Sequence, residues 1–155
     1  MSDAHTIVVP AIGAFLPDFR VVDSADAMSS LAERTRGDGS TVVFFMRAST
    51  CPICRAHVRT LEAMAESGEL GGARVVVVTP GGAAEARAVA RSTTLDVFGS
   101  GDHHRDVGLG RFLTLQHSGT FVLDASGRVL ARRASALPTA SFSRKDIRET
   151  LARTH

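Results

Sequence analysis

The sequence lacks several features that would point to particular classes of function. Its 155 residues include no tryptophan, no tyrosine and only two cysteines. All but one of its 18 basic residues are arginines, and they are scattered along the chain. Because no basic run or aromatic platform accompanies them, we expect no nucleic-acid partner. No apolar run approaches the length of a membrane-spanning helix, so we expect no membrane association.

The first ten residues, MSDAHTIVVP, lack the pattern of an export signal. They have an acid where a signal peptide would carry positive charge, and their apolar stretch is short. We therefore expect a cytoplasmic protein, in a compartment that keeps structural disulfides reduced. Hydrophobic residues make up 44% of the chain and charged residues 22%, without repeats or low-complexity linkers. This composition predicts a single globular domain over residues 1–155.

Apolar patterns alternate between those of strands and those of helices. Apolar runs predict strands covered on both faces at 41–46 and 73–80, and shorter strands are expected at 18–23 and 95–99. Residues 119–133 predict a hairpin, two strands joined by a turn at 124–127. Helical patterns follow Ser24 and Cys51, occupy 82–92 and follow Ser143, and Gly68 is expected to end the second helix. The alternation predicts an α/β fold, with a central mixed sheet flanked by helices on both faces. Strands 41–46 and 73–80 should lie parallel in its interior, with the hairpin antiparallel at one side.

The two cysteines, Cys51 and Cys54, follow the strand at 41–46, at the place where α/β sheets collect reactive groups. Pro52 suits the first helical position, which makes Cys51 the N-cap. A thiolate on Cys51 would accept hydrogen bonds from free N–H groups of the first turn and be favoured by the helix dipole. We expect Cys51 to meet solvent and have a lowered pKa, while burial raises the pKa of Cys54.

The two cysteines could instead form a structural disulfide, remain inert buried thiols or bind a metal. A structural disulfide would close too short a loop to stabilise much, and two inert buried thiols remain an alternative. A metal site would need His57, and His103 or His104, as further ligands. Adjacent histidines seldom face one ion, so we expect no metal and a solvated loop or helix start at 102–106. Arg55 stands where haem attachment requires histidine.

Three stretches of the chain resemble one family. They are GAFLPDFRVVD (13–23), VVFFMRASTCPICR (42–55) and DVGLGRFLTLQHSGTFVLDASGRVLARR (106–133). They are similar to peroxiredoxin-like proteins of the alkyl hydroperoxide reductase and thiol-specific antioxidant group, in the thioredoxin-fold superfamily. The resemblance implies a thioredoxin-like fold and thiol-dependent reduction of hydroperoxides through a reversible Cys51–Cys54 disulfide. It also implies no bound cofactor, an external thiol reductant such as a thioredoxin-like system, and a homodimer as one assembly.

The family register and the capping argument assign the thiols differently. Counted from the family's strand, the peroxidatic position is Cys54, whereas capping favours Cys51 as nucleophile and Cys54 as resolving thiol. We predict the latter, because Arg47 and Cys51 occupy the positions of the proline and threonine that define the register. Residues expected to support the pair are Thr50, Pro52, Arg47, Arg55, Gly119 and Thr120.

Two other functions are alternatives to peroxide reduction. One is a thiol–disulfide reductase that acts on a protein or small-molecule disulfide. Thioredoxins have a proline before the strand that faces the cysteines and a buried acid in the strand before them. Here Gly119 takes the place of the proline, and 41–46 has no acid, which disfavours this alternative. The other is a non-catalytic redox or metal-thiolate binding module.

Overall fold

The computed structural model describes residues 9–112 and 115–154. Within these ranges one mixed sheet has the strand order β2-β1-β5-β4-β3-β8-β9, and β6 pairs with β7. The strands are β1 (Arg20–Asp23), β2 (Met28–Ser30), β3 (Thr41–Phe45), β4 (Arg74–Thr79), β5 (Asp96–Gly99), β6 (Arg111–Phe112), β7 (Leu115–Gln116), β8 (Ser118–Leu123) and β9 (Val129–Ser135). The helices are α1 (Leu31–Thr35), α2 (Pro52–Glu66), α3 (Ala83–Ala90) and α4 (Arg144–Arg153), with short 3₁₀ turns η2 (His103–Val107) and η3 (Pro138–Ala140).

The centre of the sheet is the pair of parallel strands that the sequence predicts. Strands β3 and β4 run parallel, with Val43 opposite Val76, and β8 lies antiparallel on the other side of β3. The hairpin continues to β9 at the edge of the sheet. Every residue of β3 is buried, and so is every residue of β4 except Arg74. The apolar residues 42–45 and 75–78 are continuous because these strands are covered on both faces of the sheet. The predicted arrangement of these strands is confirmed.

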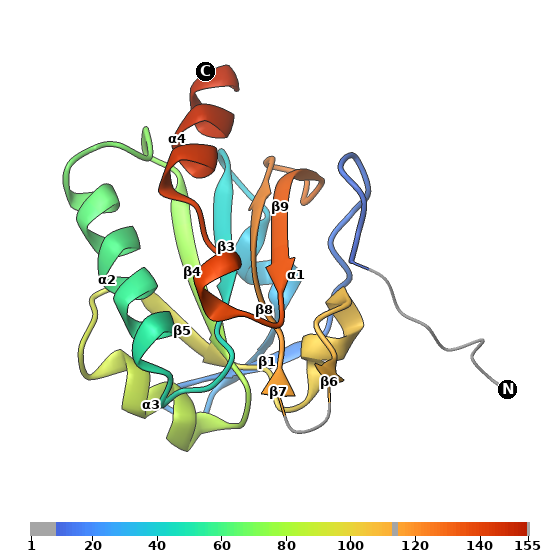
Figure 1. Cartoon of the computed structure of the whole chain (residues 1–155), viewed down its shortest axis with the longest axis vertical. Helices are drawn as coiled ribbons and strands as arrows, with labels where there is room; N and C mark the ends of the chain where they lie inside the picture. Colours follow the sequence, from blue (N-terminus) through green and yellow to red (C-terminus); the bar gives the residue numbers. More distant parts are fainter. Residues whose placement is uncertain (1–8, 113–114, 155) are drawn as a thin grey trace, which may run out of the picture.

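Helices cover both faces of the sheet (Figure 1). On one face, Val42 and Phe44 pack in a core cluster with residues of α2, α3 and α4. On the other face, Val43 and Phe45 pack with residues of α1 and η2. The alternation follows from the two-residue period of a strand. The predicted α/β class, with a thioredoxin-like fold, is confirmed.

The first predicted helix begins later than expected. Residues 24–27 form a turn, in which the Asp23 carboxylate accepts hydrogen bonds from the backbone N–H groups of Ala25 and Ala27. Strand β2 follows, and α1 starts after Ser30, whose hydroxyl accepts from the Glu33 N–H while the Glu33 carboxylate accepts from the Ser30 N–H. The prediction of an N-cap at Ser24 is therefore wrong. The helix begins after Ser30 instead, because the reciprocal capping box there satisfies two backbone groups at the helix end at once.

The other predicted helix ends agree with the structure. Gly68 has the left-handed backbone (φ 80°) that ends α2, and the Ser143 hydroxyl accepts from the Asp146 N–H at the start of α4. None of the described helices is long and apolar enough to cross a membrane. The prediction that residues 1–10 are not an export signal concerns mostly residues 1–8, which lie outside the described ranges.

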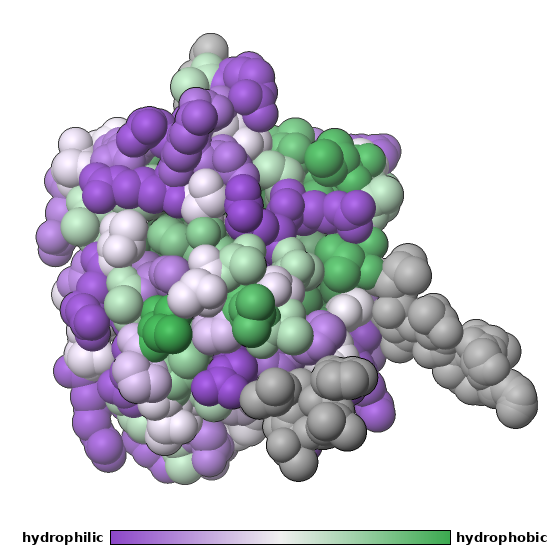
Figure 2. Space-filling model, in the orientation of Figure 1, coloured by the Kyte–Doolittle hydropathy of each residue, from purple (hydrophilic) through white to green (hydrophobic). Residues whose placement is uncertain are grey.

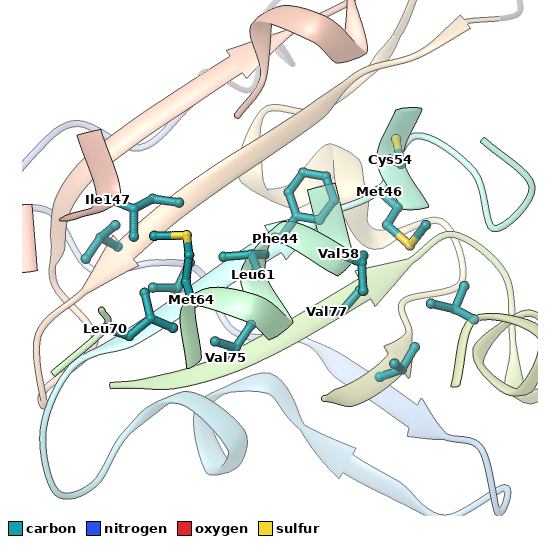
Figure 3. Close-up of a cluster of buried hydrophobic side chains, with 14 of the residues drawn as sticks. Phe44, Met46, Cys54, Val58, Leu61, Met64, Leu70, Val75, Val77 and Ile147 are labelled. Carbon is teal, nitrogen blue, oxygen red and sulfur yellow. The ribbon is translucent and has the colours of Figure 1, made fainter. Parts of the chain in front are cut away.

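The core cluster on the α2 face reaches the site of interest. Figure 3 shows Cys54 at one end of this cluster, near Met46, with Leu61 and Met64 deeper along the helix. The large apolar side chains that remain exposed are Ile12, Phe15, Met28, Ile53 and Leu137. On the face drawn in Figure 2, hydrophobic residues form separate patches with hydrophilic residues between them.

Candidate active site

The two cysteines lie just beyond the carboxyl end of β3. The chain leaves the strand at Met46 and folds back at a turn in which the Cys51 N–H donates to the Ala48 carbonyl at 3.2 Å. Helix α2 then starts at Pro52, with Cys51 as its N-cap. Proline fits there because the first helical N–H has no partner within the helix. The predicted position of the pair in the fold is confirmed.

The Cys51 sulfur caps the helix. It accepts a hydrogen bond from the Cys54 N–H at 3.3 Å, which satisfies one of the free donors of the first turn. Cys51 is only 3% exposed, so the expectation that it meets solvent is wrong. The first turn of α2 packs into the core cluster that also contains Met46, and the sulfur is covered as a result.

The two thiols differ in acidity. Burial acts to raise the pKa of Cys51, but hydrogen bonds from Cys54 and the positive charge of Arg47 outweigh it and lower this pKa below the ordinary value. Burial raises the pKa of Cys54 to about 12, and the neighbouring Cys51 thiolate adds to the effect. Cys51 is therefore the more acidic thiol of the pair, and as the pH rises it becomes a thiolate before Cys54 does.

Arg47 acts on both thiols. Its backbone N–H donates to the Cys54 sulfur at 3.3 Å, and its guanidinium lowers the pKa of Cys51. The Arg47 Nε is buried and has no hydrogen-bond partner among the described residues. The guanidinium beside Cys51 therefore has a donor that no described residue uses.

The other residues expected in the loop have different surroundings. The Arg55 guanidinium donates to the Ser49 carbonyl at 2.7 Å and to the Ala88 carbonyl at 3.2 Å. It therefore fastens the loop before Cys51 to helix α3. Thr50 and Pro52 are exposed on either side of Cys51.

Gly119 and Thr120 lie on β8, the strand that pairs with β3. Gly119 is opposite Phe45, near the end of β3 where the cysteines follow. A Cβ at Gly119 would lie 2.9 Å from the Arg133 carbonyl oxygen, so the strand has no room for a side chain there. The Thr120 hydroxyl donates to the Ser141 carbonyl at 2.7 Å. Both residues thus shape the sheet beside the site.

His104 is a residue of the site that sequence reasoning missed. It is 1% exposed, which contradicts a solvated loop, whereas the other expectation for 102–106, a helix start, agrees with η2. Its Nε2 lies 2.8 Å from the Met46 carbonyl, which can only accept, so Nε2 carries the proton and Nδ1 accepts from the Ser100 hydroxyl at 2.8 Å. Burial lowers the pKa of His104 to about 4. The neutral ring therefore holds the end of β3, one residue before Arg47.

The other two histidines considered as metal ligands, His57 and His103, have partners of their own. The His57 Nε2 lies 2.9 Å from the Pro138 carbonyl, and the His103 Nδ1 lies 2.8 Å from the Asp106 carboxylate. In residues 9–112 and 115–154 there is no group of three His, Cys, Asp or Glu side chains placed to hold a metal ion. The metal-thiolate alternative thus lacks a ligand set within the described part of the chain.

Comparison with known proteins shows the family to which this chain belongs. The family model described as the AhpC/TSA family matches residues 12–132. The chain belongs to the AhpC/TSA family. This membership, with the paired cysteines in one helical turn, makes the protein a thiol-dependent oxidoreductase of the peroxiredoxin-like type. No curated protein sequence matches it.

Solved structures agree with this AhpC/TSA-family fold. Peroxidoxin BcpB from Mycobacterium tuberculosis is similar with a TM-score of 0.77 at 20% identity, over 93% of this chain and 97% of that one. Reduced Prx3 in complex with H₂O₂ from Vibrio vulnificus has a TM-score of 0.77 at 18% identity, over 92% and 99%. A thiol peroxidase from Chromobacterium violaceum has a TM-score of 0.77 at 16% identity, over 96% and 91%.

Proposed function

We propose that this AhpC/TSA-family protein reduces hydroperoxides, with Cys51 as the nucleophile and Cys54 as the resolving thiol. The observation that carries the assignment is the opposite direction of the two pKa values within one helical turn. The thiolate is the nucleophilic form of cysteine, and the site favours it at Cys51. Cys54 stays protonated, so it does not compete for the first attack.

The proposed cycle has three steps. The Cys51 thiolate attacks the terminal peroxide oxygen, the O–O bond breaks, and the departing alkoxide takes a proton to become an alcohol. This leaves a sulfenic acid on Cys51. The Cys54 sulfur then attacks the Cys51 sulfur, the S–S bond forms as the S–O bond breaks, and the Cys54 proton leaves with the hydroxide as water. An external dithiol finally reduces the disulfide and is itself oxidised.

The supporting residues take separate roles in this proposal. Arg47 stabilises the Cys51 thiolate, and Pro52 starts the helix that Cys51 caps. Arg55 fixes the loop, because its guanidinium joins that loop to α3. Thr50 lies exposed beside Cys51 and borders the route of the substrate. Gly119 and Thr120 shape the neighbouring strand, as their contacts on β8 indicate.

We further propose a cytoplasmic location and a thioredoxin-like reductant. A cycle that ends in a disulfide needs a supply of reduced thiols, which the cytoplasm maintains. Both cysteines are buried, so the reductant must reach Cys51 past the exposed Pro52 and Ile53. A homodimer is the assembly that we propose, on family resemblance alone.

Single-cysteine variants test the assignment. Reduced Cys54→Ser protein mixed with one equivalent of hydrogen peroxide should form a sulfenic acid at Cys51, trapped by dimedone and located by mass spectrometry. Reduced Cys51→Ser protein should leave the peroxide unconsumed. The roles are reversed if Cys51→Ser consumes one equivalent while Cys54→Ser consumes none.

A competition experiment separates peroxide reduction from the alternative reaction. Reduced wild-type protein is offered hydroperoxide and a protein disulfide together, and the loss of each is followed. We expect the hydroperoxide to be consumed first. Faster loss of the protein disulfide would replace peroxide reduction by disulfide reduction as the function.

A further inference from the structure

A cleft of about 380 Å³ opens beside the loop that precedes Cys51. Ala48 and Pro80 give its wall an apolar part, while Arg47 and Arg111 bring two positive charges. Arg47 belongs to both places, because it lines the cleft and its guanidinium acts on the Cys51 thiol. Cys51 itself does not line the cleft, so Arg47 is the residue that connects a molecule bound there with the reactive thiol.

Arg111 brings the second charge from a distant part of the sequence. Its positive charge contributes to the lowered pKa of His104, the residue that binds the carbonyl of Met46. This places the Arg111 guanidinium near the carboxyl end of β3. Its Nε donates to a neutral group, the Gln116 amide oxygen, at 3.5 Å.

The cleft keeps a surplus of positive charge. Neither Arg47 nor Arg111 forms an ion pair with a carboxylate in the described part of the chain. Glu85 also lines the cleft, but its carboxylate accepts a hydrogen bond from the Gly82 N–H at 2.8 Å, at the start of α3. One acid thus stands against two arginines, and the guanidinium of Arg47 has a buried Nε without a partner.

We propose that this cleft binds the carboxylate of an organic hydroperoxide, so that the preferred substrates are anionic. The proposal rests on the peroxide reduction proposed above and names its substrate class. The peroxide group would meet Cys51 and Arg47, the apolar body would lie on Ala48 and Pro80, and the carboxylate would pair with Arg111. A guanidinium suits this role because it binds carboxylates through two parallel N–H bonds. Arg111 is a specificity-determining residue in this arrangement.

A matched pair of substrates tests the proposal. Cumene hydroperoxide and its para-carboxylate differ only in the charged group at the far end from the peroxide. The second-order rate constant for oxidation of Cys51 is measured with each, by stopped flow on reduced wild-type protein. We expect the carboxylate to react about five to ten times faster, as one partly exposed charged pair provides. The ratio should fall as salt is raised, because salt screens this pair.

Variants locate the effect. Arg111→Gln should bring the ratio of the two rate constants close to one, and Arg111→Lys should keep part of the preference because the charge remains. Arg105→Gln is the matched control, since Arg105 is exposed on the neighbouring η2 and does not line the cleft. It should leave the ratio at the wild-type value.

The outcomes separate this proposal from the reaction on which it rests. If cumene hydroperoxide oxidises wild-type Cys51 but the carboxylate reacts no faster, the cleft proposal is overturned and peroxide reduction stands. If neither compound oxidises Cys51, peroxide reduction itself fails. An equal loss of the preference in Arg111→Gln and Arg105→Gln would also overturn the assignment to Arg111, since it would reflect only the overall charge.

Discussion

The buried histidine, His104, makes the stability of the protein depend on pH in a way that can be calculated. Its neutral ring donates to the Met46 carbonyl and accepts from the Ser100 hydroxyl. Protonation would place a charge in the core and remove the acceptor at Nδ1. The folded protein therefore resists protonation at this ring, whereas the unfolded chain does not.

The sign and size of the effect follow from the two pKa values. The pKa of His104 is about 4 in the folded protein and 6.5 in an exposed histidine, so the unfolded state binds the proton first as the pH falls. The contribution to stability is complete above pH 6.5 and is lost on acidification toward pH 4. Linkage gives a loss of about 2 kcal/mol at pH 5 and about 3 kcal/mol at pH 4.

The assay compares wild-type protein with His104→Gln. Glutamine does not titrate, so the variant lacks this component of the pH dependence while it keeps that of the carboxylates. The free energy of unfolding is measured with urea at pH 7, 6, 5 and 4 for both proteins. We expect the difference in stability between them to shrink on acidification.

One result would refute the reasoning. If the difference in unfolding free energy between wild type and His104→Gln is the same at pH 7 and pH 5, His104 binds its proton equally in both states. The burial of the ring and its two hydrogen bonds would then not govern its titration.

Three further predictions concern the site and the core around it. Iodoacetamide at pH 7 should label Cys51 before Cys54, because the pKa of Cys51 is lowered and that of Cys54 is raised, and the thiolate is the form that reacts. Peptide mapping that finds Cys54 labelled first would contradict this. Arg47→Met should move the pH profile of Cys51 alkylation to higher pH through loss of the positive charge, whereas Arg59→Met, an exposed change on α2, should not. Leu61→Ala should lower the free energy of unfolding by about 2–5 kcal/mol in urea titrations, because its fully buried side chain lies in the core cluster. A loss below about 1 kcal/mol would contradict this and would mean that the surrounding core side chains move in to fill the cavity.

The sequence by itself determined the sheet and the position of the cysteine pair. Residues 42–46 and 75–78 are apolar without interruption, which is typical of strands with both faces covered. The cap at Cys51 was also predictable, because a cysteine followed by proline fits the first turn of a helix by local backbone geometry alone. The start of α1 was not predictable, since Ser24 and Ser30 are both suitable N-cap residues. The pairing of β1 with β2, which occupies 28–30, decides between them.

The tertiary structure decided what surrounds the thiols. Cys51 is covered because the first turn of α2 packs into a core made by several distant segments, which no local pattern specifies. His104 and Arg111 reach the end of β3 from a segment more than 50 residues along the chain, as their contacts with Met46 and the cleft record. Burial and charge depend on distances in space, and they set the acidity of the thiols and the polarity of the cleft. Sequence spacing therefore predicted where the chemistry lies, and long-range packing determined its environment.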